Sequence, residues 1–134
     1  MTSVLFSLNS PLTLLKVFPA LKFAESALFV GDMNFSPLDE ENRFIDPSFL
    51  DTWAYLHPDD PGYTENTDIN LMRYDFHHQR VDLKRYDRIF LRSAKWNPVS
   101  IEVIGNIPIG DNPRLFPSDH FGVCATLKWK SSCK

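Results

Sequence analysis

Three short segments of this 134-residue sequence carry the side chains best suited to acid–base and phosphate chemistry. They read Gly31-Asp32-Met33-Asn34, Tyr86-Asp87-Arg88 and Ser118-Asp119-His120. A carboxylate can orient or deprotonate water, an amide can donate to an oxyanion, and an imidazole changes its protonation near neutral pH. Each segment taken alone is also typical of a turn or of the residues that precede a strand. It is their combination in one chain that indicates a site.

Each segment adjoins an apolar run with the pattern of a strand. Ala27–Val30 is typical of a strand buried on both faces, and it leads directly into Asp32. Residues 86–91 alternate, so Asp87 shares a face with the apolar side chains of that strand, and residues 121–129 form a strand that follows His120 at once. Because a buried carboxylate without a partner is costly, we expect a cation or an imidazole beside Asp87.

The rest of the chain predicts short elements and loops. A helix begins near Leu12 and is expected to end or kink at Pro19, and another short strand is expected near residues 101–104. A second helix is expected over residues 49–56, beginning at Asp46-Pro47, with Trp53 in the core. Residues 35–45 and 63–81 lack a period and predict a solvated loop and an extended loop or hairpin tip. The expected surface histidines are His57, His77 and His78.

Composition places the chain among ordinary globular proteins and excludes the disordered, fibrous and membrane-spanning classes. It is 43% hydrophobic and 23% charged, and its 14 Lys and Arg against 17 Asp and Glu give a net charge of −3. No overall positive field therefore draws it to nucleic acid, and any such binding must be local. Its two cysteines are too few for a disulfide framework, and no secretory signal is expected, which fits a reducing nucleus or cytoplasm.

The three segments, in this order, resemble the signatures of the endonuclease/exonuclease/phosphatase superfamily, which has the DNase I-like fold. Within it, the sequence is most similar to the tyrosyl-DNA phosphodiesterase 2 family. The resemblance covers about residues 12–128 and rests on five motifs, namely Gly31-Asp32-Met33-Asn34, Asp51-x-Trp53, Tyr63-Thr64, Tyr86-Asp87-Arg88-Ile89-Phe90 and Pro117-Ser118-Asp119-His120-Phe121-Gly122.

The resemblance implies an α/β fold: the C-terminal half of a DNase I-like two-sheet sandwich. It divides the sequence into an N-terminal segment (1–11), a partial domain (12–130) and a tail (131–134). Domains of this superfamily run to about twice this length, and their first half supplies an Asn and a Glu that anchor a metal. Neither Asn9 nor Glu25 stands at the end of a strand, so we expect the missing N-terminal half to be the partner of this chain, which alone should aggregate, dimerise or be marginally stable.

The resemblance also implies roles. Asp32 orients or deprotonates the water, Asn34 donates to a phosphate oxygen, His120 binds the phosphoryl group as an imidazolium, and Asp87 holds the His120 ring. Asp119 and Asp32 are the expected ligands of Mg²⁺, with Mn²⁺ as the alternative ion. The expected substrate-binding residues are Thr64, Asn70 and Arg88, and the expected partner is DNA with a 5′-phosphotyrosyl adduct.

Two features bear on how the chain would meet DNA. Glu65 places an acidic side chain in the loop that approaches the substrate in this family, which is unfavourable next to a phosphate backbone. A basic set is available to contact phosphates, or simply to face solvent, and comprises Arg73, Arg80, Lys84, Arg85, Arg88 and Arg92.

Alternatives remain open at this stage. The chain is either part of a metal-dependent phosphodiesterase or a truncated product that binds a partner or nucleic acid without turnover. Another phosphoesterase of the superfamily, of the apurinic endonuclease, sphingomyelinase or inositol phosphatase type, fits the same motifs. A Ser/His/Asp hydrolase built on residues 118–120 is disfavoured because adjacent strand residues point in alternate directions.

Overall fold

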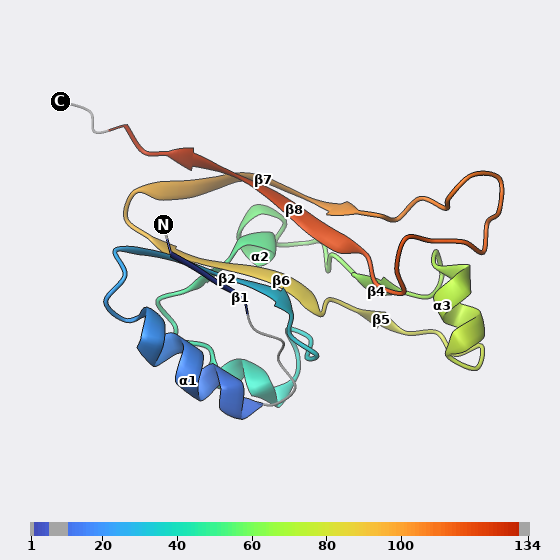
Figure 1. The fold of residues 1–134 in the computed structure, drawn as a ribbon, viewed down its shortest axis with the longest axis horizontal. Helices are drawn as coiled ribbons and strands as arrows, with labels where there is room; N and C mark the ends of the chain where they lie inside the picture. Colours follow the sequence, from blue (N-terminus) through green and yellow to red (C-terminus); the bar gives the residue numbers. More distant parts are fainter. Residues whose placement is uncertain (1, 6–10, 132–134) are drawn as a thin grey trace.

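The computed structural model describes residues 2–5 and 11–131, which form a mixed α/β fold as expected (Figure 1). Asn9, Cys133 and the remaining ends of the sequence lie outside the described residues. In chain order, the elements are β1 (Thr2–Leu5), α1 (Pro11–Leu21), β2 (Ser26–Asp32), the 3₁₀ helix η1 (Glu40–Phe44), β3 (Leu50–Asp51), α2 (Thr52–Leu56), β4 (Glu65–Asn66), α3 (Leu71–Phe76), β5 (Leu83–Lys84), β6 (Asp87–Ser93), β7 (Trp96–Ile104) and β8 (Gly122–Trp129).

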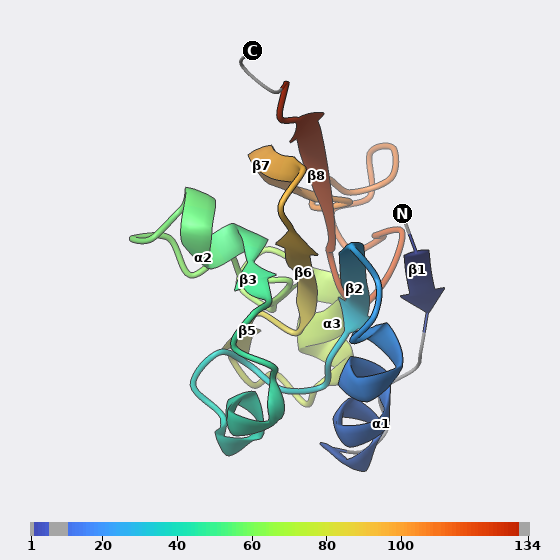
Figure 2. The same ribbon diagram turned by 90° about the vertical axis from the view of Figure 1, so that its left-hand side faces the viewer.

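The strands form one four-stranded sheet and two antiparallel pairs. The sheet has the order β1-β2-β6-β3, in which β1 is parallel to β2 and the other neighbours are antiparallel. Its register sets Asp32, at the end of β2, opposite Asp87, at the start of β6. The pairs are β4-β5 and β7-β8. Both ribbon views show α1 on one face of the sheet and β7-β8 over the other (Figures 1 and 2).

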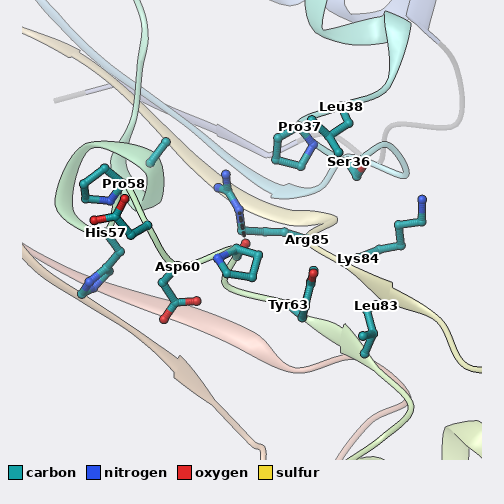
Figure 3. A pocket seen from close by; sticks show the side chains of 13 residues that line it. Ser36, Pro37, Leu38, His57, Pro58, Asp60, Tyr63, Leu83, Lys84 and Arg85 are labelled. Atoms are coloured by element: carbon teal, nitrogen blue, oxygen red, sulfur yellow. Dashed lines mark hydrogen bonds between the residues drawn. The ribbon is translucent and has the colours of Figure 1, made fainter.

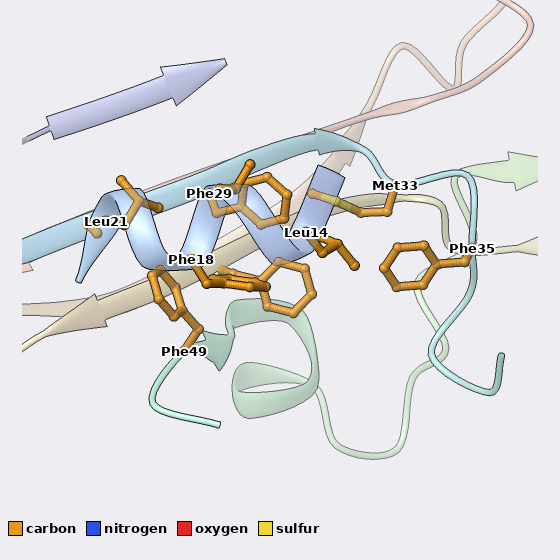
Figure 4. Close-up of a cluster of buried hydrophobic side chains, with 10 residues drawn as sticks. Leu14, Phe18, Leu21, Phe29, Met33, Phe35 and Phe49 are labelled. Carbon is orange, nitrogen blue, oxygen red and sulfur yellow. The ribbon is translucent and has the colours of Figure 1, made fainter. Parts of the chain in front are cut away.

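The main hydrophobic core lies between α1 and the sheet (Figure 4). Leu14, Phe18 and Leu21 follow helical spacing and are all buried, which is why this stretch forms an amphipathic helix on the sheet. Phe29 of β2 is fully buried, and its ring centroid lies 5.5 Å from that of Phe18 and 6.0 Å from that of Phe90. Aromatic packing therefore joins α1 to the central strands.

The helix expected to end or kink at Pro19 ends two residues later, at Leu21, and Phe18 and Leu21 on either side of the proline are both buried in the core. One expectation for this layer is wrong. Strand β2 is buried on one face only: Phe29 is buried, but Val30 on the opposite face is half-buried. Val30, Ile89 and Val123 line a cavity of about 280 Å³ between the sheet and β8.

The other helices also differ from their predicted bounds. Helix α2 begins at Thr52 rather than near Asp46, because the Asp51 carboxylate accepts hydrogen bonds from the amides of Trp53 and Ala54 and so caps the helix there. Helix α3 lies in the stretch predicted as a loop or hairpin tip, and Asn70 caps it through a hydrogen bond from the Arg73 amide. A six-residue helix with one capping side chain is too short to show a clear hydrophobic period.

The expectation for Trp53 and the expected alternation from residue 121 to 128 hold. Trp53 is buried, and its Nε1 donates to the Asp60 carbonyl at 2.9 Å. Strand β8 alternates as predicted, with half-buried Val123 and exposed Cys124. Within the part of the chain that the structure describes, no helix is both long and apolar enough to cross a bilayer.

The buried Phe29 ring yields a stability prediction. Phe29→Ala removes a side chain with 0% exposure between two other rings, and we expect it to lower the free energy of unfolding by about 3–5 kcal/mol. Phe23→Ala is the matched control, because Phe23 is 92% exposed, and its effect should stay within about 0.5 kcal/mol. Urea unfolding followed by circular dichroism measures both, and equal effects would refute this placement of the core.

Candidate active site

The strand ends bring an imidazole to the carboxylate that needed one. His120 Nδ1 lies 3.1 Å from Asp87 Oδ2, and the two side chains are 18% and 21% exposed. Asp87 opens β6 directly opposite Asp32, so a titratable pair and a second carboxylate meet at one edge of the sheet. The partner predicted for Asp87 from strand parity is therefore confirmed.

The pair favours the charged form of the imidazole. The hydrogen bond from His120 to Asp87, together with the charge of that carboxylate, raises the pKa of His120 above its ordinary value of 6.5, while burial opposes the shift. An imidazolium beside a carboxylate can donate a hydrogen bond to an anionic oxygen and also stabilise its charge. This is the electrostatic function expected of a phosphate-handling histidine.

Thr64 holds both sides of the pair in place. Its hydroxyl oxygen accepts hydrogen bonds from the backbone amides of Tyr86 at 3.1 Å and Asp87 at 3.0 Å. Its backbone carbonyl accepts from the amide of Phe121, the residue after His120, at 2.8 Å. Thr64 is 0% exposed, so it cannot contact a substrate as expected from the sequence and is a positioning residue instead.

Asn70 has a comparable role on the other side. It is 0% exposed, and its Nδ2 donates to the carbonyls of Ser118 at 3.0 Å and Asp119 at 3.1 Å while its Oδ1 caps α3. All of these bonds lie within the fold. Asn70 therefore fixes the segment that ends in His120, and the expected direct contact with substrate is wrong for it as well.

Arg88 is the third expected substrate contact, and it too is buried. Its Nε and Nη2 donate to Asp51 Oδ2 at 3.2 and 2.8 Å, and its Nη1 donates to Asn42 Oδ1 at 2.8 Å. Arg85 donates to both oxygens of Asp51 at 2.8 and 3.0 Å. Burial acts to raise the pKa of the Asp51 carboxyl, but the two guanidinium groups outweigh it and the pKa lies below its ordinary value.

Four of the six basic residues predicted to contact phosphates bind groups of the protein itself, whereas Arg80 is exposed and Lys84 is half-buried. Arg85 and Arg88 bind Asp51, and Arg92 donates to the backbone carbonyls of Leu21 and Ala24. Another member of the set, Arg73, binds Glu65, with Nη2 and Oε1 2.6 Å apart. Glu65 is itself 2% exposed, so the acidic side chain expected to oppose DNA is neutralised inside the fold.

Asp32 is the last residue of β2, whereas Asn34 lies beyond the strand in a bend. Asn34 has a φ of +53°, in the left-handed region, and its backbone amide donates to Asp32 Oδ1 at 2.8 Å. The alternation argument that put both side chains on one side of a strand therefore does not apply to Asn34. Both residues remain at the edge of the sheet that holds His120, since Asp32 is the register partner of Asp87.

Ser118 does not form a hydrolase relay with its neighbours. Its hydroxyl lies 3.2 Å from Asp119 Oδ1, whereas the His120 ring is bound to Asp87. The Asp–His pair of this site thus comes from two distant segments, and the expectation that residues 118–120 form no Ser/His/Asp triad is confirmed.

The two expected metal ligands have suitable chemistry but are too few. Asp119 is exposed and lies 3.8 Å from Arg73 Nη1, and both it and Asp32 offer the hard oxygen atoms that Mg²⁺ prefers. Over residues 2–5 and 11–131, the one group of three metal-ligating side chains is Glu65, His77 and Asp82, which contains neither. Two carboxylates of this chain do not make a Mg²⁺ site by themselves, and we derive no catalytic step through a metal.

The histidines outside the site are only partly as predicted. His78 is exposed as expected. His57 is half-buried and its Nε2 lies 3.1 Å from the Ile101 carbonyl, so it joins α2 to β7. His77 is also half-buried, with an inaccessible Nδ1. The sequence around these histidines does not predict which of them are exposed, because the exposure of each ring depends on which distant segment covers it.

A pocket formed by the neighbouring loops is separate from the His120–Asp87 pair (Figure 3). It has a volume of about 420 Å³ and lies between residues 36–38, residues 57–61 and the start of β5. Tyr63, Lys84 and Arg85 are among the residues that line it. None of the strand-end residues discussed above lines it, so it supplies no part of the candidate active site.

Comparison with known proteins identifies the fold. No family model and no curated protein matches the sequence. The structure is similar to a humanised D. rerio TDP2, with a TM-score of 0.69 and 28% identity over 88% of this chain and 48% of that one. The chain has a TDP2-like, DNase I-like fold.

Further TDP2 structures agree with this finding. D. rerio TDP2 complexed with a single-strand DNA product gives a TM-score of 0.68 and 27% identity, over 88% of this chain and 49% of that one. TDP2 from C. elegans gives a TM-score of 0.67 and 23% identity, over 87% of this chain and 35% of that one. The chain thus spans about half the length of the D. rerio structures. The similarity supports a phosphodiesterase-type fold, and the resemblance seen in the sequence motifs is confirmed at that level.

The buried Asp51 cluster generates a second stability prediction. Asp51→Asn removes the charge that two buried guanidinium groups share, and we expect it to lower the free energy of unfolding by about 3–5 kcal/mol. Asp46→Asn is the matched control: Asp46 holds only local bonds to Ser48, and its change should cost less than about 1 kcal/mol. Urea unfolding at pH 7 checks both, and a near-neutral Asp51→Asn would show that the cluster is not stabilising.

The His120–Asp87 pair generates a pH prediction. NMR titration of the His120 imidazole should give a pKa above 6.5, and Asp87→Asn should lower it because the hydrogen-bonded carboxylate is removed. Since the pKa is raised in the folded state, the stabilisation by this pair is fully present below pH 6.5 and is lost as pH rises through the folded-state pKa. His78 is the internal reference, and a His120 pKa unchanged by Asp87→Asn would rule out the coupling.

Proposed function

We propose that this chain carries the phosphate-handling part of a metal-dependent phosphodiesterase that hydrolyses 5′-phosphotyrosyl bonds in DNA. The observation that carries the proposal is the His120–Asp87 pair at a sheet edge shared with Asp32, within a TDP2-like fold. Phosphodiester hydrolysis requires an activated water and stabilisation of negative charge on the phosphoryl oxygens. The pair is suited to the second task.

Each residue of the site has a role under this proposal. His120, as an imidazolium, donates to a non-bridging phosphate oxygen and stabilises the charge that grows there. Asp87 keeps the His120 ring oriented and protonated, as the raised pKa of His120 supports. Asp32 orients or deprotonates the attacking water, and the Asn34 side-chain amide donates to a second phosphate oxygen.

The proposed cofactor is Mg²⁺, with Mn²⁺ as the alternative ion. Asp119 and Asp32 are its proposed ligands, and a bound divalent ion would neutralise phosphate charge. Because two carboxylates are too few, the site requires further oxygen ligands from outside this chain's described residues. Activity of the chain alone is therefore expected to be far below that of a protein with the complete ligand set.

The proposed partner is DNA, with the site at a 5′ end that carries a tyrosyl adduct. Support comes from D. rerio TDP2, whose structure holds a single-strand DNA product. Four arginines near the site bind carboxylates or backbone carbonyls of the protein itself, so we expect affinity to depend on the reacting end more than on phosphate contacts from these arginines. A nuclear or cytoplasmic location fits this substrate and the free, exposed thiol of Cys124.

A second candidate is a binding module without turnover. The observation that favours it is the small number of candidate metal ligands. The described residues offer Asp32 and Asp119, whereas a Mg²⁺ site needs more anionic ligands than these two. Binding of a single-stranded oligonucleotide without Mg²⁺ and without any hydrolysis, including in the complete protein described below, would support this candidate over the enzyme. The other phosphoesterases of the superfamily are distinguished by offering abasic-site DNA, sphingomyelin and an inositol phosphate in the same assay.

The activity prediction uses a 5′-phosphotyrosyl oligonucleotide with Mg²⁺. The chain is assayed alone and joined to the part of D. rerio TDP2 that it does not cover. In the joined protein, His120→Ala should lower kcat about 10²–10³-fold because it removes a charged donor to the transition state. His78→Ala should leave kcat unchanged, because His78 is exposed and outside the site.

Release of tyrosine, followed by chromatography, measures the rate. If the joined protein is active and His120→Ala retains full activity, the role of His120 is wrong. If the joined protein folds but hydrolyses none of the offered substrates, the phosphodiesterase proposal itself fails.

A further inference from the structure

A second group of ligating side chains lies apart from the His120–Asp87 pair. It consists of Glu65 in β4, His77 at the C-terminal cap of α3 and Asp82, which precedes β5. One ligand atom from each residue lies within 4.8 Å of the other two. We propose that Glu65, His77 and Asp82 form a binding site for a divalent transition-metal ion, with Zn²⁺ as the ion best suited to these donors.

The unpartnered imidazole is the first observation in favour. His77 Nδ1 is buried, and it is the one buried side-chain nitrogen or oxygen atom in the described part of the chain without a hydrogen-bond partner. Leaving a polar atom buried without a partner costs free energy, so such atoms call for a ligand. A neutral imidazole presents a lone pair that a metal ion would bind.

The two carboxylates also have unused oxygen atoms. Both contacts from Arg73 go to Glu65 Oε1: Nε donates a hydrogen bond at 2.7 Å, and Nη2 forms an ion pair at 2.6 Å. Asp82 is held by its backbone, since its amide donates to Thr67 Oγ1 at 2.7 Å and its carbonyl accepts from the Thr67 amide and hydroxyl. Within residues 11–131, no hydrogen bond or ion pair to the Asp82 carboxylate is found. The backbone is therefore fixed while the carboxylate remains available.

Charge favours a cation at this point. The two carboxylates face the single guanidinium of Arg73, and a divalent ion would balance the excess negative charge. Arg73 orients the Glu65 carboxylate, as residues behind metal ligands do. The same guanidinium separates this cluster from Asp119, which lies 3.8 Å from Arg73 Nη1, so the cluster is distinct from the proposed catalytic ligands.

The donor types select the ion. One imidazole nitrogen and two carboxylate oxygens match zinc sites that complete a tetrahedron with water, whereas Mg²⁺ prefers oxygen ligands alone. Ligand atoms around tetrahedral Zn²⁺ lie about 3.3 Å apart, given bonds of about 2.0 Å. Because the ligand atoms lie within 4.8 Å of one another, the side chains would have to close by at most about 1.5 Å, within reach of rotamer adjustment in a Glu and an Asp.

The position of the cluster indicates a structural role. An ion bound there would join the C-terminal end of α3 to both strands of the β4-β5 pair. The N-terminal cap of α3 is Asn70, which holds the carbonyls of Ser118 and Asp119. The metal would thus stabilise the segment that ends in His120, although the proposal does not depend on the proposed catalytic function.

Binding to the whole chain tests the proposal directly. After dialysis against EDTA, isothermal titration with Zn²⁺ should show one ion per chain, and Zn²⁺ should raise the thermal midpoint. His77→Gln and Asp82→Asn should each weaken binding at least about tenfold. His78→Gln is the matched control and His120→Gln a second one, and both should bind Zn²⁺ as the unaltered chain does.

Spectroscopy on the unaltered chain keeps the test decisive if a variant fails to fold. Long-range ¹H–¹⁵N NMR should show the His77 Nδ1 resonance shifting on addition of Zn²⁺, and Co²⁺ should give the strong visible absorption of a four-coordinate site. Stoichiometric binding that His77→Gln leaves unchanged, a shift confined to His120, or no binding by the unaltered chain would each overturn the proposal. None of these results would bear on hydrolysis, which is tested separately at His120.

Discussion

The carboxylate of Asp51 is the point on which the arrangement of the site depends. It caps α2 and binds Arg85 and Arg88, the two guanidinium groups on either side of the Tyr86–Asp87 step. The Asp51 side chain is only 15% exposed. Its hydrogen bonds and the opposite charges of the two arginines offset the cost of burying it. One acidic side chain therefore joins a helix N-terminus to the beginning of β6, and so sets where the Asp87 side chain emerges.

Around this cluster, polar side chains that could serve a substrate are used inside the protein. Thr64 binds the amides of Tyr86 and Asp87 and, through its carbonyl, the amide of Phe121, while Asn70 binds the carbonyls of Ser118 and Asp119. Buried networks of this kind are rigid because each member would lose a partner if any other moved. They hold Asp87 and His120, which are 33 residues apart in the chain, at hydrogen-bonding distance. The Asp87 and His120 side chains thus lie at the edge of the sheet, and the residues that position them are buried beneath.

Local pattern predicted the strands and the need for a partner at Asp87, because alternation along one segment is enough to place a side chain on an apolar face. The same reasoning failed where the decisive contact was distant. Helix α3 depends on a single cap, and His77 differs from His78 only in what covers it. The motif resemblance found the correct fold but assigned Thr64, Asn70 and Arg88 to the substrate, since a motif identifies a position without saying whether its side chain is buried.

The sequence by itself determined the types of residue at the strand ends, the alternation that forms β6 and β8, and the requirement that Asp87 meet a cation or an imidazole. Only the tertiary structure decided that this partner is His120, that Asp51 gathers two arginines, and that Glu65 binds Arg73. The physical reason is that strand periodicity is a local property of the backbone. The burial and hydrogen-bond partners of a polar side chain depend instead on segments that lie tens of residues away in the chain and come together only in the folded protein.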